Sequence, residues 1–378
     1  MARINRPIST LVTAVALCLA PSAFTTLHGR DGHADRPVPA PEPKVFYSLD
    51  QESGAPLFAS GQVQTDGFLA WMKEKNLPVS RLVLSSRIIR GELDGLDEPT
   101  RKAKVDKIKA AAATAKIKLI RLSIISAKGE PSIASPIEEE RKKAVAQHVK
   151  LAKLAAELGC SQVSVLVESS GFYEDQKKAA KGGLAVLMAG MKEDNVNGIE
   201  VLVSNGPGLS DNGVWLRQVL DEIRGDKKDV NIGLLLDVDR LDYNPKTAFG
   251  ELTTPAKKKD QSQPVTPVTN DASRQVTPNP EVNRDPPTTP NVASEPPCDL
   301  KAIVFESYDS NGDVEVSGLS DKLSRALLGK AKFQGDISIR YRGKYQAGIT
   351  STHKKLIAQF GKEEAETAPQ TTPKPETK

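Results

Sequence analysis

The stretch GDISIRYRG at residues 335–343 has the alternating pattern of a short β-strand. One face would carry three apolar side chains, Ile337, Ile339 and Tyr341. The opposite face would carry three polar ones, Ser338, Arg340 and Arg342. The pattern therefore predicts a strand near the end of the chain, with one apolar and one polar face.

Seven earlier segments also have the composition of strands. In chain order, the predicted strands are residues 44–49, 81–86, 117–125, 161–168, 199–205, 231–237, 300–307 and 336–341. Several are almost continuous apolar runs, which is typical of parallel strands buried on both faces.

Helical patterns separate most of these strands. In the clearest one, Ser135 is the expected N-cap, Pro136 takes the first helical position and Gly159 stops the helix. Two further segments are predicted as helices, residues 105–115 and 212–223. Alternating strands and helices of this number predict an α/β fold, a (β/α)8 TIM barrel.

The N-terminus has the pattern of a secretory signal peptide. Arg3 and Arg6 form a basic region, and residues 11–20 form an apolar run that is too short to span a bilayer. We therefore expect residues 1–23 to be a signal peptide and the protein to be exported, to a periplasmic or extracellular location. No other stretch is long and apolar enough for a transmembrane segment.

Proline-rich segments divide the rest of the chain. Residues 24–44 are expected to be an extended tether, and residues 364–378 a disordered tail. Residues 245–297 lack any apolar period and are expected to be a disordered insertion that replaces most of the sixth helix. The barrel would then occupy residues 45–363, interrupted by this Pro/Thr-rich insertion between strands six and seven.

The net charge and the cysteines bear on two properties of the protein, nucleic-acid binding and disulfide formation. The net charge of +4 is small and the basic residues are dispersed, so the sequence gives no indication of nucleic-acid binding. Cys160 and Cys298 precede different predicted strands, and we expect buried thiols and no disulfide between them.

Several segments resemble the xylose isomerase-like TIM barrels, the sugar phosphate isomerase/epimerase family. These segments are HVKLAKLAAELGCSQVSV (148–165), IEVLVSNGPG (199–208), GLLLDVDRL (233–241), AIVFESYDSNGDVE (302–315) and ISIRYRGKYQAGITSTHKKLI (337–357). The last resembles I-E-Y-E-G followed by a G-I-x-x-T helix. The resemblance covers most of residues 45–360 and implies a sugar isomerase or epimerase.

The same resemblance implies a divalent metal held by Glu, Asp, His and Glu on strands five to eight. Carried over position by position, these ligands fall on Ser204, Asp237, a residue near Val304 or Phe305, and Arg340. Only Asp237 keeps a metal-ligand side chain, because a serine is a weak ligand and an arginine repels a cation. The sequence therefore predicts a degenerate metal site and no cofactor.

Arg340 could instead replace the metal. We expect its guanidinium to pair with Asp237 and with Glu306, because buried carboxylates need a compensating cation. Glu168 at the end of strand four and Asn205 beside the lost glutamate are further candidate ligand-binding residues. The alternative is that Arg340 points into solvent.

The predicted positions of the four histidines do not supply a metal site. His148 falls beside the apolar stripe of its helix, where packing explains it, and His353 is expected on the surface. His28 and His33 lie in the predicted tether. None falls at a strand end.

Three functions follow as hypotheses. The favoured one is an exported, catalytically inactive pseudoenzyme of this family that keeps a sugar-binding or scaffolding role. The second is an active isomerase or epimerase whose rearranged site holds a divalent metal with Glu168, Asp237 or Glu306. The third is an envelope interaction protein whose barrel is a platform for the Pro/Thr-rich segments.

Overall fold

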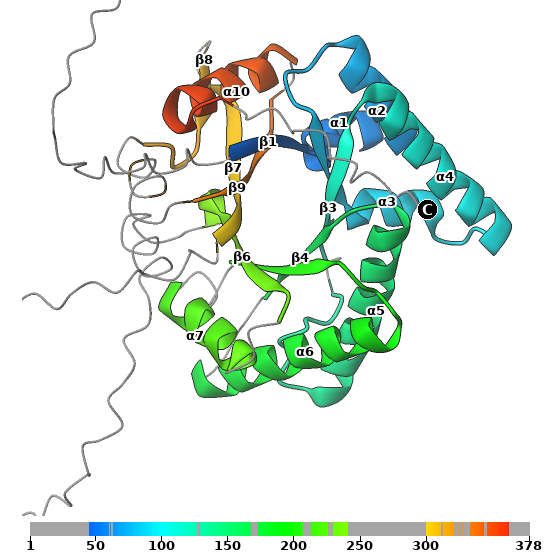
Figure 1. Ribbon diagram of the computed structural model, residues 1–378, viewed down its shortest axis with the longest axis vertical. Coiled ribbons are helices and arrows are strands. Elements are labelled where there is room, and N and C mark those ends of the chain that lie inside the picture. Colours follow the sequence, from blue (N-terminus) through cyan, green and yellow to red (C-terminus); the bar gives the residue numbers. More distant parts are fainter. Residues whose placement is uncertain are drawn as a thin grey trace, which may run out of the picture. The chain divides into compact units, whose positions relative to one another are not determined.

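Eight parallel strands form a closed barrel in the computed structural model (Figure 1). The structure describes residues 45–59, 61, 63–126, 129–167, 173–206, 213–225, 230–240, 300–310, 313–320, 325, 327, 333–343 and 346–362. The barrel strands are β1 (Val45–Asp50), β2 (Arg81–Ser85), β3 (Lys118–Ile124), β4 (Gln162–Leu166), β5 (Glu200–Ser204), β6 (Ile232–Asp237), β7 (Leu300–Ser310) and β9 (Gly335–Tyr341). All eight lie within the predicted segments or extend them by a few residues.

The barrel strands follow one another around the ring in the order of the chain, as expected of a TIM barrel. Strands β1 to β6 are neighbours in sequence order, β9 lies between β1 and β7, and the pairing of β6 with β7 closes the ring. Since every barrel pairing is parallel, the carboxyl ends of all eight strands open at the same end of the barrel. The predicted fold class is confirmed.

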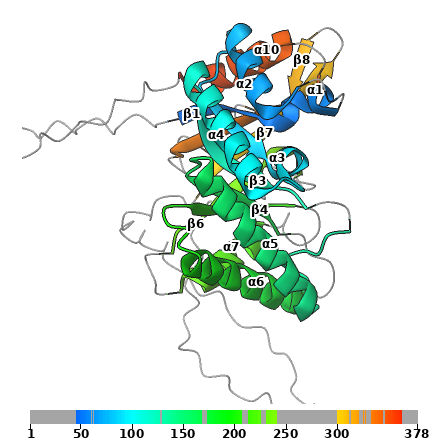
Figure 2. The ribbon, with the colours of Figure 1, turned by 90° about the vertical axis from the view of Figure 1, so that its right-hand side faces the viewer.

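Helices surround the ring, as Figures 1 and 2 show. The α-helices are α1 (Ala55–Ala59), α2 (Thr65–Glu74), α3 (Ser86–Leu93), α4 (Glu98–Ala115), α5 (Glu138–Glu157), α6 (Tyr173–Glu193), α7 (Gly213–Arg224) and α10 (Gln346–Phe360). Short 3-10 helices follow β1 and β6, η1 (Gln51–Gly54) and η3 (Val238–Arg240). The three helices predicted from the sequence correspond to α5, α4 and α7.

The predicted start of α5 was wrong. The N-cap is Ile137, and Ser135 lies two residues before it. The Ser135 hydroxyl accepts a hydrogen bond from the Ile137 amide at 3.2 Å and donates to Glu140 at 2.7 Å, so it orders the turn that leads into the helix. The predicted stop is present, because Gly159 follows the helix with φ = +82°.

The sequence did not predict a hairpin on β7. This strand continues to Ser310 and pairs in an antiparallel manner with β8 (Asp313–Val316). Because β8 has only four residues, it gives too short an alternation to be distinguished from a loop.

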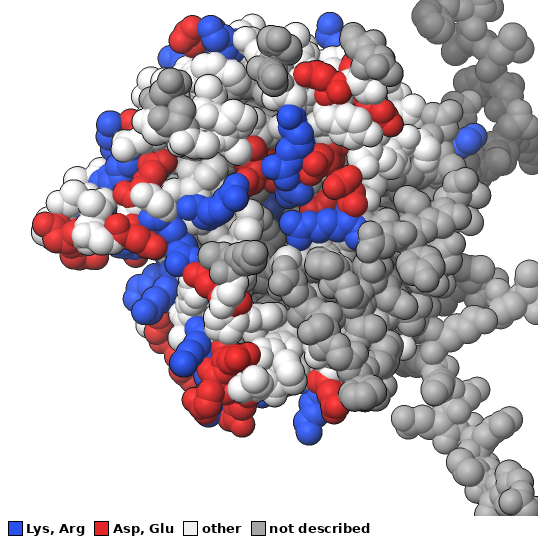
Figure 3. Space-filling model, turned by 180° about the vertical axis from the view of Figure 1, so that it is seen from behind, with Lys and Arg blue, Asp and Glu red and all other residues white. Residues whose placement is uncertain are grey.

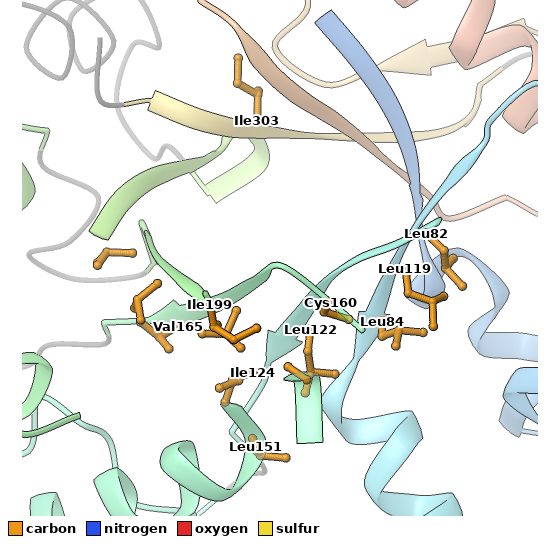
Figure 4. Packing of buried hydrophobic residues seen from close by; sticks show 14 of the residues in the cluster. Leu82, Leu84, Leu119, Leu122, Ile124, Leu151, Cys160, Val165, Ile199 and Ile303 are labelled. Atoms are coloured by element: carbon orange, nitrogen blue, oxygen red, sulfur yellow. The ribbon is translucent and has the colours of Figure 1, made fainter. Parts of the chain in front are cut away.

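The main hydrophobic core lies between the outer face of the barrel and the helices. Figure 4 shows side chains of this cluster, among them Leu84 from β2, Leu122 from β3 and Leu151 from α5. Cys160 packs in the same cluster as a free thiol, and burial raises its pKa to about 12. As predicted, this cysteine acts as a small buried hydrophobic residue.

Charged residues of both signs lie side by side on the surface, as the face in Figure 3 shows. Ion pairs join neighbouring helices, such as Lys177 on α6 with Glu222 on α7 at 2.9 Å and Lys104 on α4 with Asp66 on α2 at 2.9 Å. No helix within the described ranges is long and apolar enough to cross a membrane. The predicted signal peptide, tether, insertion, tail and Cys298 all lie outside the described residues.

Two adjacent glycines in α6 predict opposite effects of the same substitution. A Cβ at Gly183 would lie 1.9 Å from the carbonyl oxygen of Ile133, whereas one at Gly182 would meet only the Arg141 side chain, at 3.9 Å. We expect Gly183→Ala to lower the free energy of unfolding by about 1–3 kcal/mol. Gly182→Ala should raise it by up to about 1 kcal/mol, because alanine favours the helix. Urea unfolding of both variants tests this, and equal effects would contradict the close packing.

Candidate functional site

Contacts between strands that are not neighbours identify the inside of the barrel. Arg340 on β9 contacts Asp237 on β6, and Arg121 on β3 contacts Ser338 on β9. Such contacts must cross the lumen, so these side chains point inward. Four other inward side chains on β5 to β7 form a small apolar cluster, Leu202, Leu235, Ala302 and Val304. The lumen therefore combines polar side chains with a small apolar cluster.

The Arg340 guanidinium bridges two carboxylates at the carboxyl end of the barrel. Its Nη1 donates to Asp237 Oδ2 at 2.8 Å, and its Nε and Nη2 lie 3.1 and 3.0 Å from Asp50 Oδ2. Arg340 is only 7% exposed, and both aspartates are buried. The predicted pairing of Arg340 with Asp237 is present, and the alternative of a solvent-exposed arginine is wrong.

Burial and the neighbouring carboxylates have opposite effects on the pKa of Arg340. Burial favours the neutral form, but the charges of Asp50 and Asp237 and their hydrogen bonds outweigh it, so the pKa of Arg340 lies above its ordinary value. The guanidinium is therefore a permanent cation within the barrel. Asp50 was missed in the sequence, although its alternation with Ser48 along β1 places both on the inward face.

Asp237 is held by its backbone as well as by its side chain. The Asn205 amide accepts from the Asp237 N–H at 2.7 Å and donates to the Asp237 carbonyl oxygen at 2.9 Å. Arg240 adds a second cation, 3.2 Å from Asp237 Oδ2. Asp237 Oδ1 has no hydrogen-bond partner among the described residues. Asn205 thus aligns the ends of β5 and β6, and its contact with a ligand remains a prediction.

Glu306 lies at the edge of the same cluster. Its Oε2 is 3.9 Å from Arg340 Nη1, and its Oε1 is 3.2 Å from Nε of Arg342, which is 44% exposed on its side chain. The predicted contact of Glu306 with Arg340 is therefore a weak one. Glu168, the remaining carboxylate candidate, lies outside the described residues.

A second polar layer lies deeper in the lumen. Arg121 Nη2 donates to the Ser338 hydroxyl at 2.5 Å, and Ser338 in turn donates to Asp336 Oδ2 at 2.7 Å. Ser48 also donates to Asp336 Oδ2, at 2.7 Å. Burial raises the pKa of Asp336, although Arg121 and the two serines partly offset it. The signal for this layer was polar residues at alternate positions of β1, β3 and β9.

A cavity of about 30 Å³ lies beside the Arg340 cluster and Arg121. Its polar lining residues are Asp50, Arg121, Ser123, Ser164, Ser204, Asp237, Arg240 and Arg340. By the usual measure this volume holds about two water molecules.

The side chains at the four implied ligand positions do not fit a divalent metal. Of the two candidates for the histidine position, Val304 points into the lumen, while Phe305 packs outside against Phe360. Asp237 Oδ2 is already bound by two guanidinium groups, and the Ser204 hydroxyl lies 3.2 Å from the Asn205 carbonyl oxygen. Among the residues described, no group of three His, Cys, Asp or Glu side chains could hold a metal ion.

The two histidines in the described part of the chain are both buried. His148 packs beside the α5 core, with Nδ1 2.8 Å from the Ala144 carbonyl oxygen, as expected. The prediction that His353 is exposed was wrong, because it is only 7% exposed and packs edge-on against Tyr47. Its position on the inner side of α10 explains this. Burial lowers the pKa of both histidines.

Comparison with known proteins identifies the fold. No protein-family model and no curated protein matches the chain. The IolI protein with a bound zinc atom matches with a TM-score of 0.54 and 10% identity, over 85% of this chain and 100% of that one. D-psicose 3-epimerase in the presence of D-fructose matches with a TM-score of 0.51 and 9% identity, over 84% and 100%.

A xylose isomerase domain protein from Alicyclobacillus acidocaldarius also matches, with a TM-score of 0.50 and 12% identity, over 84% of this chain and 98% of that one. The chain thus has the fold of the xylose isomerase-like TIM barrels, whose solved members include sugar epimerases and isomerases. This confirms the predicted resemblance as a likeness of fold, which does not by itself specify an activity.

Removing Arg340 should destabilise the protein strongly. Arg340→Met leaves Asp50 and Asp237 buried without their shared cation, a change that costs about 3–5 kcal/mol in comparable sites. Arg342→Met is the matched control, because Arg342 lies two residues away at the exposed rim and should cost at most about 1 kcal/mol. Denaturant unfolding measures both, and equal costs would show that the Arg340 pairs contribute little.

Proposed function

We propose that this protein binds a small sugar-like molecule at the carboxyl ends of its barrel strands and does not catalyse a metal-dependent isomerisation. The observation that carries the proposal is the position of Arg340. Its guanidinium lies between Asp50 and Asp237, where the fold's resemblance implies a metal ligand. A fixed cation there satisfies the carboxylates that would otherwise attract a metal.

The same geometry argues against an isomerase mechanism that uses Arg340 in place of the metal. Isomerisation requires a Lewis acid that polarises substrate oxygens and a base that moves the proton. The charge of Arg340 is already neutralised by two carboxylates, so little remains to polarise a substrate. Asp237 is likewise engaged by Arg340 and Arg240.

Sugar binding is supported by the unsatisfied polar groups around the cavity. Asp237 Oδ1 is an acceptor without a donor among the described residues, and the hydroxyls of Ser123 and Ser204 line the same space. A sugar hydroxyl both donates and accepts, so it can complete such a set. The structurally similar D-psicose 3-epimerase supports the same ligand class. The cavity itself is too small for a sugar ring, so a sugar would place a hydroxyl in it and its ring above it.

Calorimetric titration with D-fructose as the probe tests the proposal. We expect saturable binding to the wild type, and binding about tenfold weaker in Asp237→Asn, which loses a charged acceptor. Glu139→Gln, an exposed carboxylate on α5, is the control and should bind as the wild type does. Absence of sugar binding in the wild type would contradict the binding role.

Metal analysis and an activity assay test the proposed absence of catalysis, independently of the sugar-binding test. We expect no stoichiometric divalent metal in the purified protein, and no conversion of D-fructose to its C3 epimer with or without added Mn²⁺. One equivalent of metal that is lost in Asp237→Ala, together with conversion, would establish the alternative of an active isomerase with a rearranged site.

Export is part of the same proposal. It is supported by the basic residues Arg3 and Arg6 followed by the apolar run at residues 11–20. N-terminal sequencing of the protein from the native cells should give a chain that starts near residue 24, recovered outside the cytoplasm. A full-length chain in the cytoplasmic fraction would contradict export.

A further inference from the structure

Arg121 is the least satisfied charged side chain in the described part of the barrel. It lies in the middle of β3, is 1% exposed, and makes one hydrogen bond, from Nη2 to Ser338. Its Nε and Nη1 have no acceptor among the described residues. A buried donor without an acceptor loses its hydrogen bonds to water and gains none in return. The site therefore favours a partner that brings acceptors.

The nearest carboxylate does not meet this need. Asp336 Oδ2 is 3.7 Å from Arg121 Nη2, beyond hydrogen-bonding distance, and already accepts from Ser48 and Ser338. Burial raises the pKa of Asp336, which weakens it as a counter-charge. A guanidinium, in contrast, stays protonated in proteins even where burial lowers its pKa.

The cavity beside Arg121 has a positive lining. Three arginines line it, Arg121, Arg240 and Arg340, against two aspartates, Asp50 and Asp237. The described lining residues therefore carry one net positive charge. Three serine hydroxyls, those of Ser123, Ser164 and Ser204, also line the cavity and can rotate to donate hydrogen bonds.

We propose that this cavity is a binding site for one compact monovalent anion, a halide ion or a carboxylate group, with Arg121 as its principal donor. The volume of about 30 Å³ suits an occupant of this size and is too small for a sugar ring. Such an anion would accept hydrogen bonds from Arg121 and offset the net charge of the lining. The inference does not require sugar binding, although both proposals use the hydroxyls of Ser123 and Ser204, which line the same cavity.

Thermal unfolding at constant ionic strength tests the anion site. Chloride, bromide or formate should raise the Tm of the wild type in a saturable manner, as expected for a ligand of the native state. Methanesulfonate, a bulkier monovalent anion, is the reference and should not. In Arg121→Gln the apparent affinity should fall at least tenfold, whereas Arg342→Gln, which carries its charge outside the cavity, should behave as the wild type. Equal shifts in both variants, or the same shift with methanesulfonate, would overturn the proposal.

Anomalous diffraction from wild-type crystals soaked in bromide gives a test that does not depend on the folding of a variant. We expect a bromide peak within hydrogen-bonding distance of Arg121 Nε or Nη1. Displacement of the peak by formate would identify a carboxylate group as an accepted occupant, and displacement by chloride alone would identify the inorganic ion. No peak beside Arg121 would overturn the proposal.

Discussion

A buried guanidinium shared by two buried carboxylates is the constraint on which the carboxyl end of this barrel depends. Arg340 links its own strand β9 to the neighbouring β1 through Asp50 and, across β7, to β6 through Asp237. Each of the three charges would be costly alone in this environment. Together with Arg240, the second cation beside Asp237, they balance in charge and tie three strand ends together without a metal.

Polar and charged side chains also fill much of the rest of the lumen. A typical TIM barrel is filled with branched apolar side chains, but the apolar cluster inside this one is small, made of Leu202, Leu235, Ala302 and Val304. The strands β1, β3 and β9 contribute serines, aspartates and arginines in two layers. Because the main hydrophobic core lies between the outer face of the barrel and the helices, the fold tolerates this exchange inside. What distinguishes this barrel chemically is therefore its interior.

The sequence predicted much of the fold, because alternating or continuous apolar runs mark all eight strands. It also predicted that Arg340 meets Asp237, since both fall at strand ends of one barrel. Asp50, Arg121 and Asp336 could not be predicted as partners, because contacts across the lumen depend on the tilt and stagger of the strands. The prediction that His353 is exposed was wrong for a similar reason, because the rotation of α10 against β1 decides whether this side chain is buried. The roles of Glu168 and of the Pro/Thr-rich insertion remain predictions.

Anomalous diffraction from wild-type crystals soaked in Mn²⁺ tests directly whether Arg340 occupies the place of a metal. We predict that the Arg340 guanidinium stays between Asp50 and Asp237 and that no manganese peak lies beside Asp237. A manganese ion coordinated by Asp237, with Arg340 turned away from both aspartates, would contradict the claim that the arginine takes the place of the metal.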